Sequence, residues 1–394
     1  MELSAIQSAL KDAALDGWLF YDFRGSDPTA QRILGLSRTS LQTRRWFYFI
    51  PARGEPTKIV HAIESTAIDL LPGGKLVYLP WQQLHDHLRL TVGAGRKIAM
   101  QFSAKNNIPY VAKVDAGTVD LIRSFGVEVT SSADLIQQFE ATISPEQWES
   151  HVYAADRLAA LVPAVFQEIG RRLAGGIATT EYDIQQFMVE RYARDGLISD
   201  HAPIVAVSEN AADPHYEPTP ARAKRIEPGQ IVLVDTWAKR DLPGAIYADI
   251  TWMGYTGTKV PERFTQVFNI VRDARDAAIE AVRKAQASGQ KIRGCDVDDA
   301  CRKVIHDTGF GPYFIHRTGH SIHETDHGNG ANIDNLETCD DRQLIPRTLF
   351  SIEPGIYLTG DFGIRSEVDV FLPDARSLCV SGAPPQTAIT PIPL

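Results

Sequence analysis

The chain has 394 residues, 44% of them hydrophobic and 23% charged, with a formal net charge of −9. This length exceeds that of an ordinary domain with a single hydrophobic core, so we expect two or three domains in a soluble globular protein. The acidic balance argues against nucleic acid or membrane as a partner, because phosphate groups require a basic binding face.

The N-terminus lacks the basic start and continuous apolar stretch of a signal peptide. No run of eighteen apolar residues is present, so no membrane-spanning helix is expected. The cysteines form no CxxC pair, and we interpret them as buried reduced thiols rather than metal ligands. These features predict a cytoplasmic protein whose four thiols are Cys295, Cys301, Cys339 and Cys379.

Residues 1–140 alternate helical and strand patterns, which predicts a mixed sheet surrounded by helices. No catalytic constellation is evident there. Apolar spacing predicts a first helix over 3–15, and a second helix is expected between the last two strands. The strands are expected at 18–23, 45–50, 58–62, 75–79, 97–102 and 125–130.

Residues 141–394 form the second expected domain, of the α+β class with a curved, largely antiparallel sheet. Ser144-Pro145 begins a long helix that Gly175-Gly176 should stop, and Thr180 caps a helix over 181–194. Two further helices are expected over 261–287 and 296–308. Strands are expected at 204–208, 231–238, 247–255, 348–358 and 364–372.

Two aspartates stand on neighbouring strands of that domain. Asp235 ends the apolar run 231–234, and strand alternation places Tyr247, Asp249 and Thr251 on one face. A turn containing Pro243-Gly244 would bring the two acids together. Adjacent buried carboxylates repel unless they are protonated or share a cation. For Asp235 alone, a strand-end acid that reaches water is an equally good interpretation.

The segment 316–327 holds four of the eleven histidines, at positions 316, 320, 323 and 327. Imidazole is a common neutral ligand for transition metals, and this density is unusual for a surface loop. Not all four can be ligands in a carboxylate-rich site. We interpret His323 as structural or supporting, and His306 as an ordinary surface histidine.

Two glutamates complete the set. Glu353 precedes Pro354, which favours an extended backbone, and Glu367 shares a strand face with Arg365 and Asp369. Arg365 could be no more than a salt-bridge partner of Glu367. Four carboxylates and one histidine suit paired Mn²⁺, Co²⁺ or Zn²⁺ ions better than a closed structural zinc site.

These segments resemble the Xaa-Pro dipeptidase (prolidase) and aminopeptidase P branch of the pita-bread metallopeptidases. The resemblance covers nearly the whole chain, with a creatinase-like domain over 1–140 and a pita-bread catalytic domain over 141–394. The motifs that carry it are VDTW (234–237), ADIT (248–251), HRTGH (316–320), SIEPGIY (351–357) and IRSEVDV (364–370).

The resemblance implies two divalent ions, with Mn²⁺ as the expected metal and Co²⁺ or Zn²⁺ as alternatives. It also implies a metal-bridging hydroxide that attacks the bond before proline in Xaa-Pro dipeptides. It implies a homodimer, and Glu353, His215 and His327 as the catalytic residues. The substrate-binding residues would be His215, His316, His327 and Arg365. The metal ligands would be Asp235, Asp249, His320, Glu353 and Glu367.

Two departures from the family pattern bear on substrate preference. Asp235 and Asp249 are separated by a slightly longer hairpin than usual, and His323 stands where glycine is common.

The first alternative to an Xaa-Pro dipeptidase is an Xaa-Pro aminopeptidase acting on longer peptides. The second is a non-catalytic binding protein on the same fold. A methionine aminopeptidase is disfavoured because those enzymes generally lack the large N-terminal domain.

Overall fold

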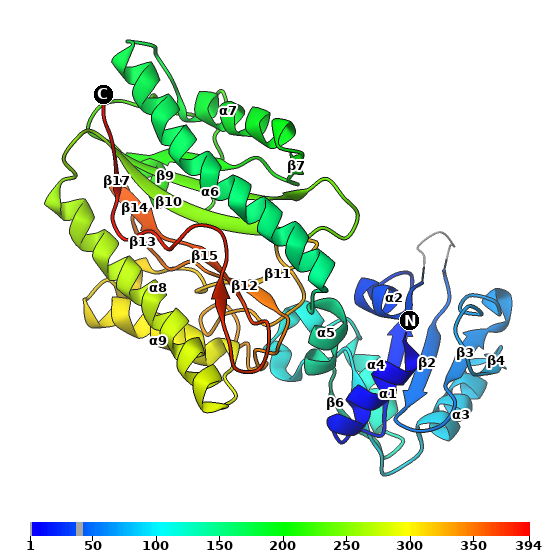
Figure 1. Ribbon diagram of the computed structural model, residues 1–394. Coiled ribbons are helices and arrows are strands. Elements are labelled where there is room, and N and C mark those ends of the chain that lie inside the picture. Colours follow the sequence, from blue (N-terminus) through cyan, green and yellow to red (C-terminus); the bar gives the residue numbers. More distant parts are fainter. Residues whose placement is uncertain (1, 37–41) are drawn as a thin grey trace. The chain divides into compact units, whose positions relative to one another are not determined.

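The computed structural model describes residues 2–36 and 42–394 (Figure 1). The chain divides into two compact units, Met1–Glu140 and Ala141–Leu394. Each unit has its own sheets, helices and buried apolar clusters.

The first unit is built on a mixed six-stranded sheet with the order β4-β3-β2-β1-β5-β6. Strand alternation gives the sheet two apolar faces: Trp18 and Phe20 pack on one side, and Leu19 and Tyr21 on the other. Helices α1, α2 and α5 cover the first face, and α3 and α4 cover the second. The strands are β1 (Gly17–Asp22), β2 (Trp46–Pro51), β3 (Thr57–His61), β4 (Gly74–Tyr78), β5 (Lys97–Met100) and β6 (Glu128–Ser131).

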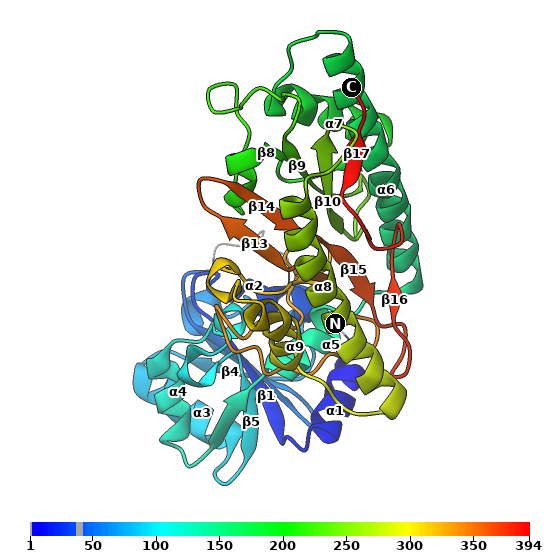
Figure 2. The ribbon, with the colours of Figure 1, turned by 90° about the vertical axis from the view of Figure 1, so that its left-hand side faces the viewer.

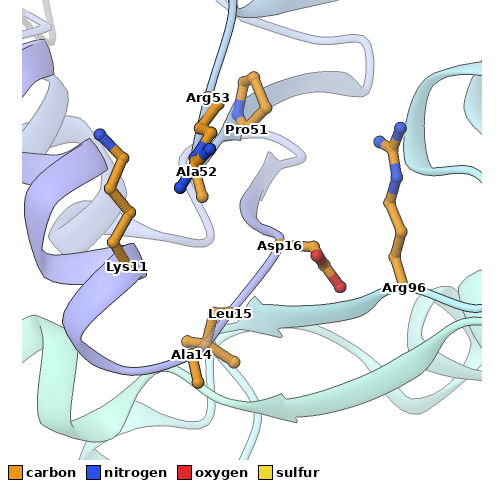
Figure 3. A pocket seen from close by; sticks show the side chains of 8 residues that line it. All are labelled: Lys11, Ala14, Leu15, Asp16, Pro51, Ala52, Arg53 and Arg96. Atoms are coloured by element: carbon orange, nitrogen blue, oxygen red, sulfur yellow. The ribbon is translucent and has the colours of Figure 1, made fainter.

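The helices of this unit are α1 (Leu3–Asp12), α2 (Pro28–Leu34), α3 (Trp81–Val92), α4 (Ala116–Arg123) and α5 (Ala133–Glu140). The mixed sheet agrees with the expectation from sequence, whereas α2, α3 and α5 were not predicted. A hollow of about 470 Å³ also lies in this unit (Figure 3). It is lined by Lys11, Ala14, Leu15, Asp16, Pro51, Ala52, Arg53 and Arg96, none of which is a predicted site residue.

The second unit begins with two capped helices. Ser144 caps α6 (Pro145–Ala174) and Thr180 caps α7 (Glu181–Arg194), each in a reciprocal capping box. Both helices were predicted. They pack on one face of the sheet formed by β7 (Leu197–Ile198), β8 (Ile204–Val207), β9 (Ile231–Arg240), β10 (Ala248–Thr256) and β17 (Thr390–Ile392).

Figure 2 shows α8 (Glu262–Ser288) and α9 (Gly294–Asp307) lying side by side. Their apolar residues share a cluster with Ile231 and Leu233 of β9, whereas Val232 and Val234 face α6. By the same alternation, Asp235 follows Ile231 and Leu233 onto the face away from α6. The strand pattern therefore fixes the side of the sheet on which the acid lies.

The remaining strands form two smaller sheets, β11-β12-β15-β16 and β13-β14. Every strand pair of the second unit is antiparallel except β10 with β17, among the residues described. The bounds are β11 (Ser321–Ile322), β12 (Leu349–Ile352), β13 (Gly355–Leu358), β14 (Phe362–Arg365), β15 (Val368–Phe371) and β16 (Cys379–Val380).

Two strand predictions were wrong in a way that matters for the site. The expected strand over 348–358 is two strands, β12 and β13, separated at Glu353-Pro354. Pro354 has no N–H to continue a ladder. The expected strand over 364–372 is likewise divided at Ser366-Glu367 into β14 and β15. Arg365 and Glu367 therefore do not lie on one strand.

The cysteine interpretation needs one correction. Cys295 and Cys301 are buried free thiols, but Cys379 is half-buried and Cys339 is exposed. His306 is exposed on α9, as expected. Among the described helices, none combines the length and the apolar run that a membrane span requires.

Candidate metal centre

Asp235 and Asp249 are placed by the β9–β10 hairpin. Asp235 lies directly opposite Thr251, and Asp249 lies opposite Trp237, so the two acids are diagonal neighbours on one face. The Thr251 hydroxyl lies 3.1 Å from Asp235 Oδ1 and 2.7 Å from Glu367 Oε2. A hydroxyl has one proton, so Thr251 can satisfy only one of these carboxylates at a time.

His320 is held by hydrogen bonds on both sides of its backbone. Its N–H donates to Ser351 Oγ at 3.0 Å, and its carbonyl accepts from Ser351 N at 2.8 Å. The Nδ1 atom faces the Ser321 carbonyl at 3.3 Å. A carbonyl only accepts, so Nδ1 carries the proton and Nε2 keeps its lone pair, as a metal ligand requires.

Glu353 and Glu367 lie at the two strand breaks, where their backbone N–H groups bond to other segments. Glu353 N donates to the Thr318 carbonyl at 2.7 Å, and Glu367 N donates to the Thr251 carbonyl at 3.2 Å. Each glutamate is thus tied to a segment that carries another predicted ligand. The breaks that contradict the strand predictions bring these side chains to one place.

The structure brings the five predicted ligands together. Ligand atoms of Asp249, His320 and Glu367 all lie within 4.8 Å of one another. His320 Nε2 lies 3.7 Å from Asp249 Oδ2 and 3.4 Å from Glu353 Oε1. Asp235 joins through Thr251. We call these five residues the acid–histidine cluster.

The chemistry of the cluster fits divalent cations. Burial and neighbouring carboxylates hold the pKa values of Asp249 and Glu367 well above their ordinary values. Burial raises the pKa of Glu353 to about 7 and holds that of His320 well below its usual value. Asp249 Oδ1 and Glu367 Oε1 are shielded from solvent without a hydrogen-bond partner. These two unpartnered oxygens and the neutral imidazole nitrogen are suited to bind cations.

Arg365 lies at the same place but pairs with a different acid from the one expected. It is 5% exposed and forms an ion pair with Asp235 rather than with Glu367. Its Nε donates to Thr251 Oγ1 at 3.0 Å, and a terminal nitrogen donates to the Pro214 carbonyl at 3.4 Å. All three guanidinium nitrogens therefore already have protein partners.

The other predicted histidines surround the cluster. His327 packs its ring 4.3 Å from that of His320 and is exposed. His316 Nδ1 donates to the Arg317 carbonyl at 2.7 Å, so Nε2 accepts from the Tyr357 hydroxyl at 2.8 Å. Burial and Arg365 lower the pKa of His316 to about 3, so it is neutral. His215 is exposed, next to Pro214.

Sequence analysis missed three acids that support this region. Asp326 directly precedes His327, within the histidine-rich segment. Asp369 Oδ2 accepts the Asp249 N–H at 2.8 Å. Glu181 is buried at the start of α7 and accepts from Tyr216, the neighbour of His215, at 2.6 Å. The position of Asp369 two residues after Glu367 was a signal, whereas nothing near Glu181 in the sequence points to His215.

Residues 154–374 match metallopeptidase family M24, and this span exceeds half of the 394-residue chain. The chain therefore belongs to metallopeptidase family M24, which confirms the resemblance inferred from the sequence. It is 30% identical to the Xaa-Pro dipeptidase of Lactobacillus delbrueckii subsp. lactis over 164 residues, covering 42% of this chain and 40% of that protein. Alignments with curated relatives cover between 40% and 64% of those relatives' own lengths.

Solved structures share the fold over almost the whole chain. The dipeptidase PepE of Mycobacterium ulcerans is 23% identical with a TM-score of 0.67, covering 100% of this chain and 97% of that one. The X-prolyl aminopeptidase of Caenorhabditis elegans, described as having a di-nuclear active site, is 18% identical with a TM-score of 0.58. That match covers 94% of this chain and 58% of the other. These likenesses confirm the expected α+β pita-bread fold.

Proposed function

We propose that this chain is a two-metal peptidase that hydrolyses the bond before proline in Xaa-Pro dipeptides. The acid–histidine cluster carries the proposal: five candidate ligands converge, and two of their buried oxygens have no hydrogen-bond partner. The family assignment and the names of the relatives support it. The creatinase-like identity of residues 1–140 and the catalytic identity of residues 141–394 belong to the same proposal.

Asp235, Asp249, His320, Glu353 and Glu367 would hold the two cations. When bound, divalent cations polarise the scissile carbonyl and lower the pKa of a water molecule. Mn²⁺ as the native metal and a homodimeric state are expectations that come from the family resemblance.

Glu353 would move the proton. Ser351 Oγ donates to its Oε1 at 3.1 Å, which leaves Oε2 to accept a proton from the attacking water. The same group would return that proton to the proline nitrogen as the C–N bond breaks. The neutral His316 and the exposed His215 and His327 are proposed to contact the substrate around this point.

An Xaa-Pro aminopeptidase that accepts longer peptides is the second candidate, and the engagement of Arg365 favours it. A dipeptidase must bind a free carboxylate one residue past the scissile bond, and a guanidinium fork suits that task. Here one terminal nitrogen pairs with Asp235, the other donates to the Pro214 carbonyl, and Nε donates to Thr251 Oγ1. Arg365 could bind a substrate carboxylate only by releasing one of these partners.

The experiment is hydrolysis of Ala-Pro by chelated protein, followed by addition of Mn²⁺, Co²⁺ or Zn²⁺ and elemental analysis. We expect chelation to abolish activity and one metal to restore it at two ions per chain. Full turnover by protein holding almost no metal would contradict the two-metal proposal. Metal binding without hydrolysis of any Xaa-Pro peptide would instead favour a non-catalytic binding protein.

A further inference from the structure

Asp326 reaches the acid–histidine cluster from the histidine-rich segment. One ligand atom each from His320, Asp326 and His327 lie within 4.8 Å of one another. This group shares His320 with the group formed by Asp249 and Glu367. The Asp326 and Asp249 carboxyl groups also lie within hydrogen-bonding reach of each other. Asp326 is thus the one acid of this segment that approaches both groups.

The hydrogen bonding of Asp326 matches that of the proposed ligands. Its Oδ1 is shielded from solvent and has no hydrogen-bond partner, as is also true of Asp249 Oδ1 and Glu367 Oε1. Asp369 Oδ1 shares this property, but among the described residues Asp369 belongs to neither metal-holding group. Two carboxyl groups within hydrogen-bonding reach of each other require a shared proton or a cation between them.

The free nitrogen of His320 indicates which cation Asp326 would reach. Because Nδ1 carries the proton toward the Ser321 carbonyl, only Nε2 can bind a metal. A cation on Nε2 therefore faces Asp249 and Glu353, and a carboxylate oxygen of Asp326 lies within 4.8 Å of a ring nitrogen of His320. The ion pair of Asp326 with His327 Nε2, at 3.7 Å, is made by Oδ2 and leaves Oδ1 without a partner.

We propose that Asp326 is a sixth protein ligand of the metal centre and binds the cation that His320 holds. This inference rests on the proposed two-metal function. Addition of a fifth carboxylate makes the site harder and raises its coordination number. Oxygen-rich sites of this kind suit Mn²⁺ better than Zn²⁺, which commonly takes four ligands. Asp326 would thereby tune the centre toward manganese.

The test compares metal-free wild type, Asp326→Asn and Glu324→Gln by calorimetric titration with Mn²⁺ and, separately, Zn²⁺. Glu324→Gln is the matched control, because it removes one charge from an exposed residue of the same segment. We expect two Mn²⁺ ions per chain in all three proteins. In Asp326→Asn, one Mn²⁺ Kd should rise by at least about 10–100-fold, the range that loss of a group supporting the ligands already produces, and the Zn²⁺ Kd should rise less.

Thermal unfolding separates a ligand from a residue that merely supports the fold. Removal of a carboxylate from a repelling pair should leave the metal-free protein at least as stable, while the rise in Tm on addition of Mn²⁺ shrinks. A lower Tm without metal, with an unchanged rise on Mn²⁺ addition, would overturn the inference. So would unchanged Kd values in Asp326→Asn.

A crystal structure of manganese-loaded wild type measures the contact without any variant. An Asp326 oxygen should lie at a carboxylate-to-metal bonding distance of about 2.0–2.6 Å from an ion, and a separation beyond about 3 Å would overturn the inference. Wild type that binds no divalent cation would contradict the proposed function itself. Wild type that binds two ions with Asp326 uninvolved would contradict only the role of Asp326.

Discussion

Two buried carboxylates, one in each unit, differ in their hydrogen bonding. In the first unit, Asp22 is fully buried, and its oxygens accept from Gly25 N at 2.7 Å, Ser26 N at 3.2 Å and Gln31 Nε2 at 2.8 Å. In the second unit, Glu367 is 2% exposed, with Thr251 on one oxygen and no partner on the other. Burial is equal, so the supply of donors is what distinguishes the two carboxylates.

The second unit also contains a fully satisfied acid, which shows that the contrast is local. Glu181 is fully buried and accepts from Val207 N at 2.7 Å, Lys224 N at 2.7 Å and the Tyr216 hydroxyl at 2.6 Å. The Asn210 amide adds contacts to both oxygens. Glu181 therefore ties down the segment that carries His215, whereas Glu367 is available to a cation.

The largest expected effect is the loss of turnover when a poorly satisfied acid is neutralised. Glu353→Gln is nearly isosteric but cannot accept a proton, so kcat on Ala-Pro should fall about 10²–10⁴-fold. Asp22→Asn, which makes the same change at a satisfied acid, should keep the wild-type kcat. Steady-state kinetics of the metal-loaded proteins at one temperature decide this. A near-normal kcat in Glu353→Gln would show that the proton goes elsewhere.

The second expected effect is on the stability of the metal-free protein. Burial and the neighbouring Glu353 and Asp235 hold the pKa of Glu367 well above its usual value, so its negative charge is unfavourable without a cation, and Glu367→Gln removes that charge. The free energy of unfolding should not fall. Asp22→Asn places an amide NH₂ group, itself a donor, against the donors that now bind the carboxylate, and should lower the free energy of unfolding by about 1–3 kcal/mol. Urea unfolding of the chelated proteins measures both, and equal losses would remove the distinction between the two acids.

Much of the placement of the site residues was accessible from the sequence, because strand alternation and motif spacing are local properties. Alternation along 231–234 and 247–251 placed Asp235 and Asp249 on one face, as the β9–β10 register shows. The capped helices α6 and α7 were likewise predicted from Ser144 and Thr180. Such signals depend on neighbours within a few residues.

Pro354 was a signal for the break at Glu353, but the break at Glu367 and the donor supply were not accessible, because both depend on distant segments. Glu353 N donates to the Thr318 carbonyl, and Glu367 N donates to the Thr251 carbonyl. Similarly, Glu181 finds Tyr216 and Lys224 only after the chain folds back. Nothing in the sequence beside Asp326 distinguishes it from the exposed Glu324.

A smaller effect is expected where a satisfied acid holds a site residue in place. Glu181→Gln would point an amide at one of the backbone donors and lose at least one hydrogen bond, worth ~1 kcal/mol. Amide hydrogen exchange in residues 207–224 should then speed up several-fold, with α8 unchanged as the internal control. Mass spectrometry of the exchanged protein provides the measurement. Uniform acceleration across the chain would indicate global destabilisation instead.

The smallest expected effect concerns Arg365, which the contrast assigns to Asp235 rather than to the substrate. We expect wild type to cleave Ala-Pro faster than Ala-Pro-Ala, since His323 is bulkier than the glycine common at its position and would restrict the exit. Loss of a charged hydrogen bond to a substrate carboxylate would cost ~1.5–3 kcal/mol, or at least about tenfold in relative kcat/KM. Because the guanidinium already contacts Asp235, Thr251 and Pro214, Arg365→Lys should change the dipeptide-to-tripeptide ratio by less than about tenfold.

The kcat/KM values for both peptides should fall together in Arg365→Lys, because lysine does not reproduce the planar guanidinium that contacts Asp235 and Thr251. A selective loss on Ala-Pro would show that Asp235 releases Arg365 in the complex, and a wild-type preference for Ala-Pro-Ala would identify an aminopeptidase.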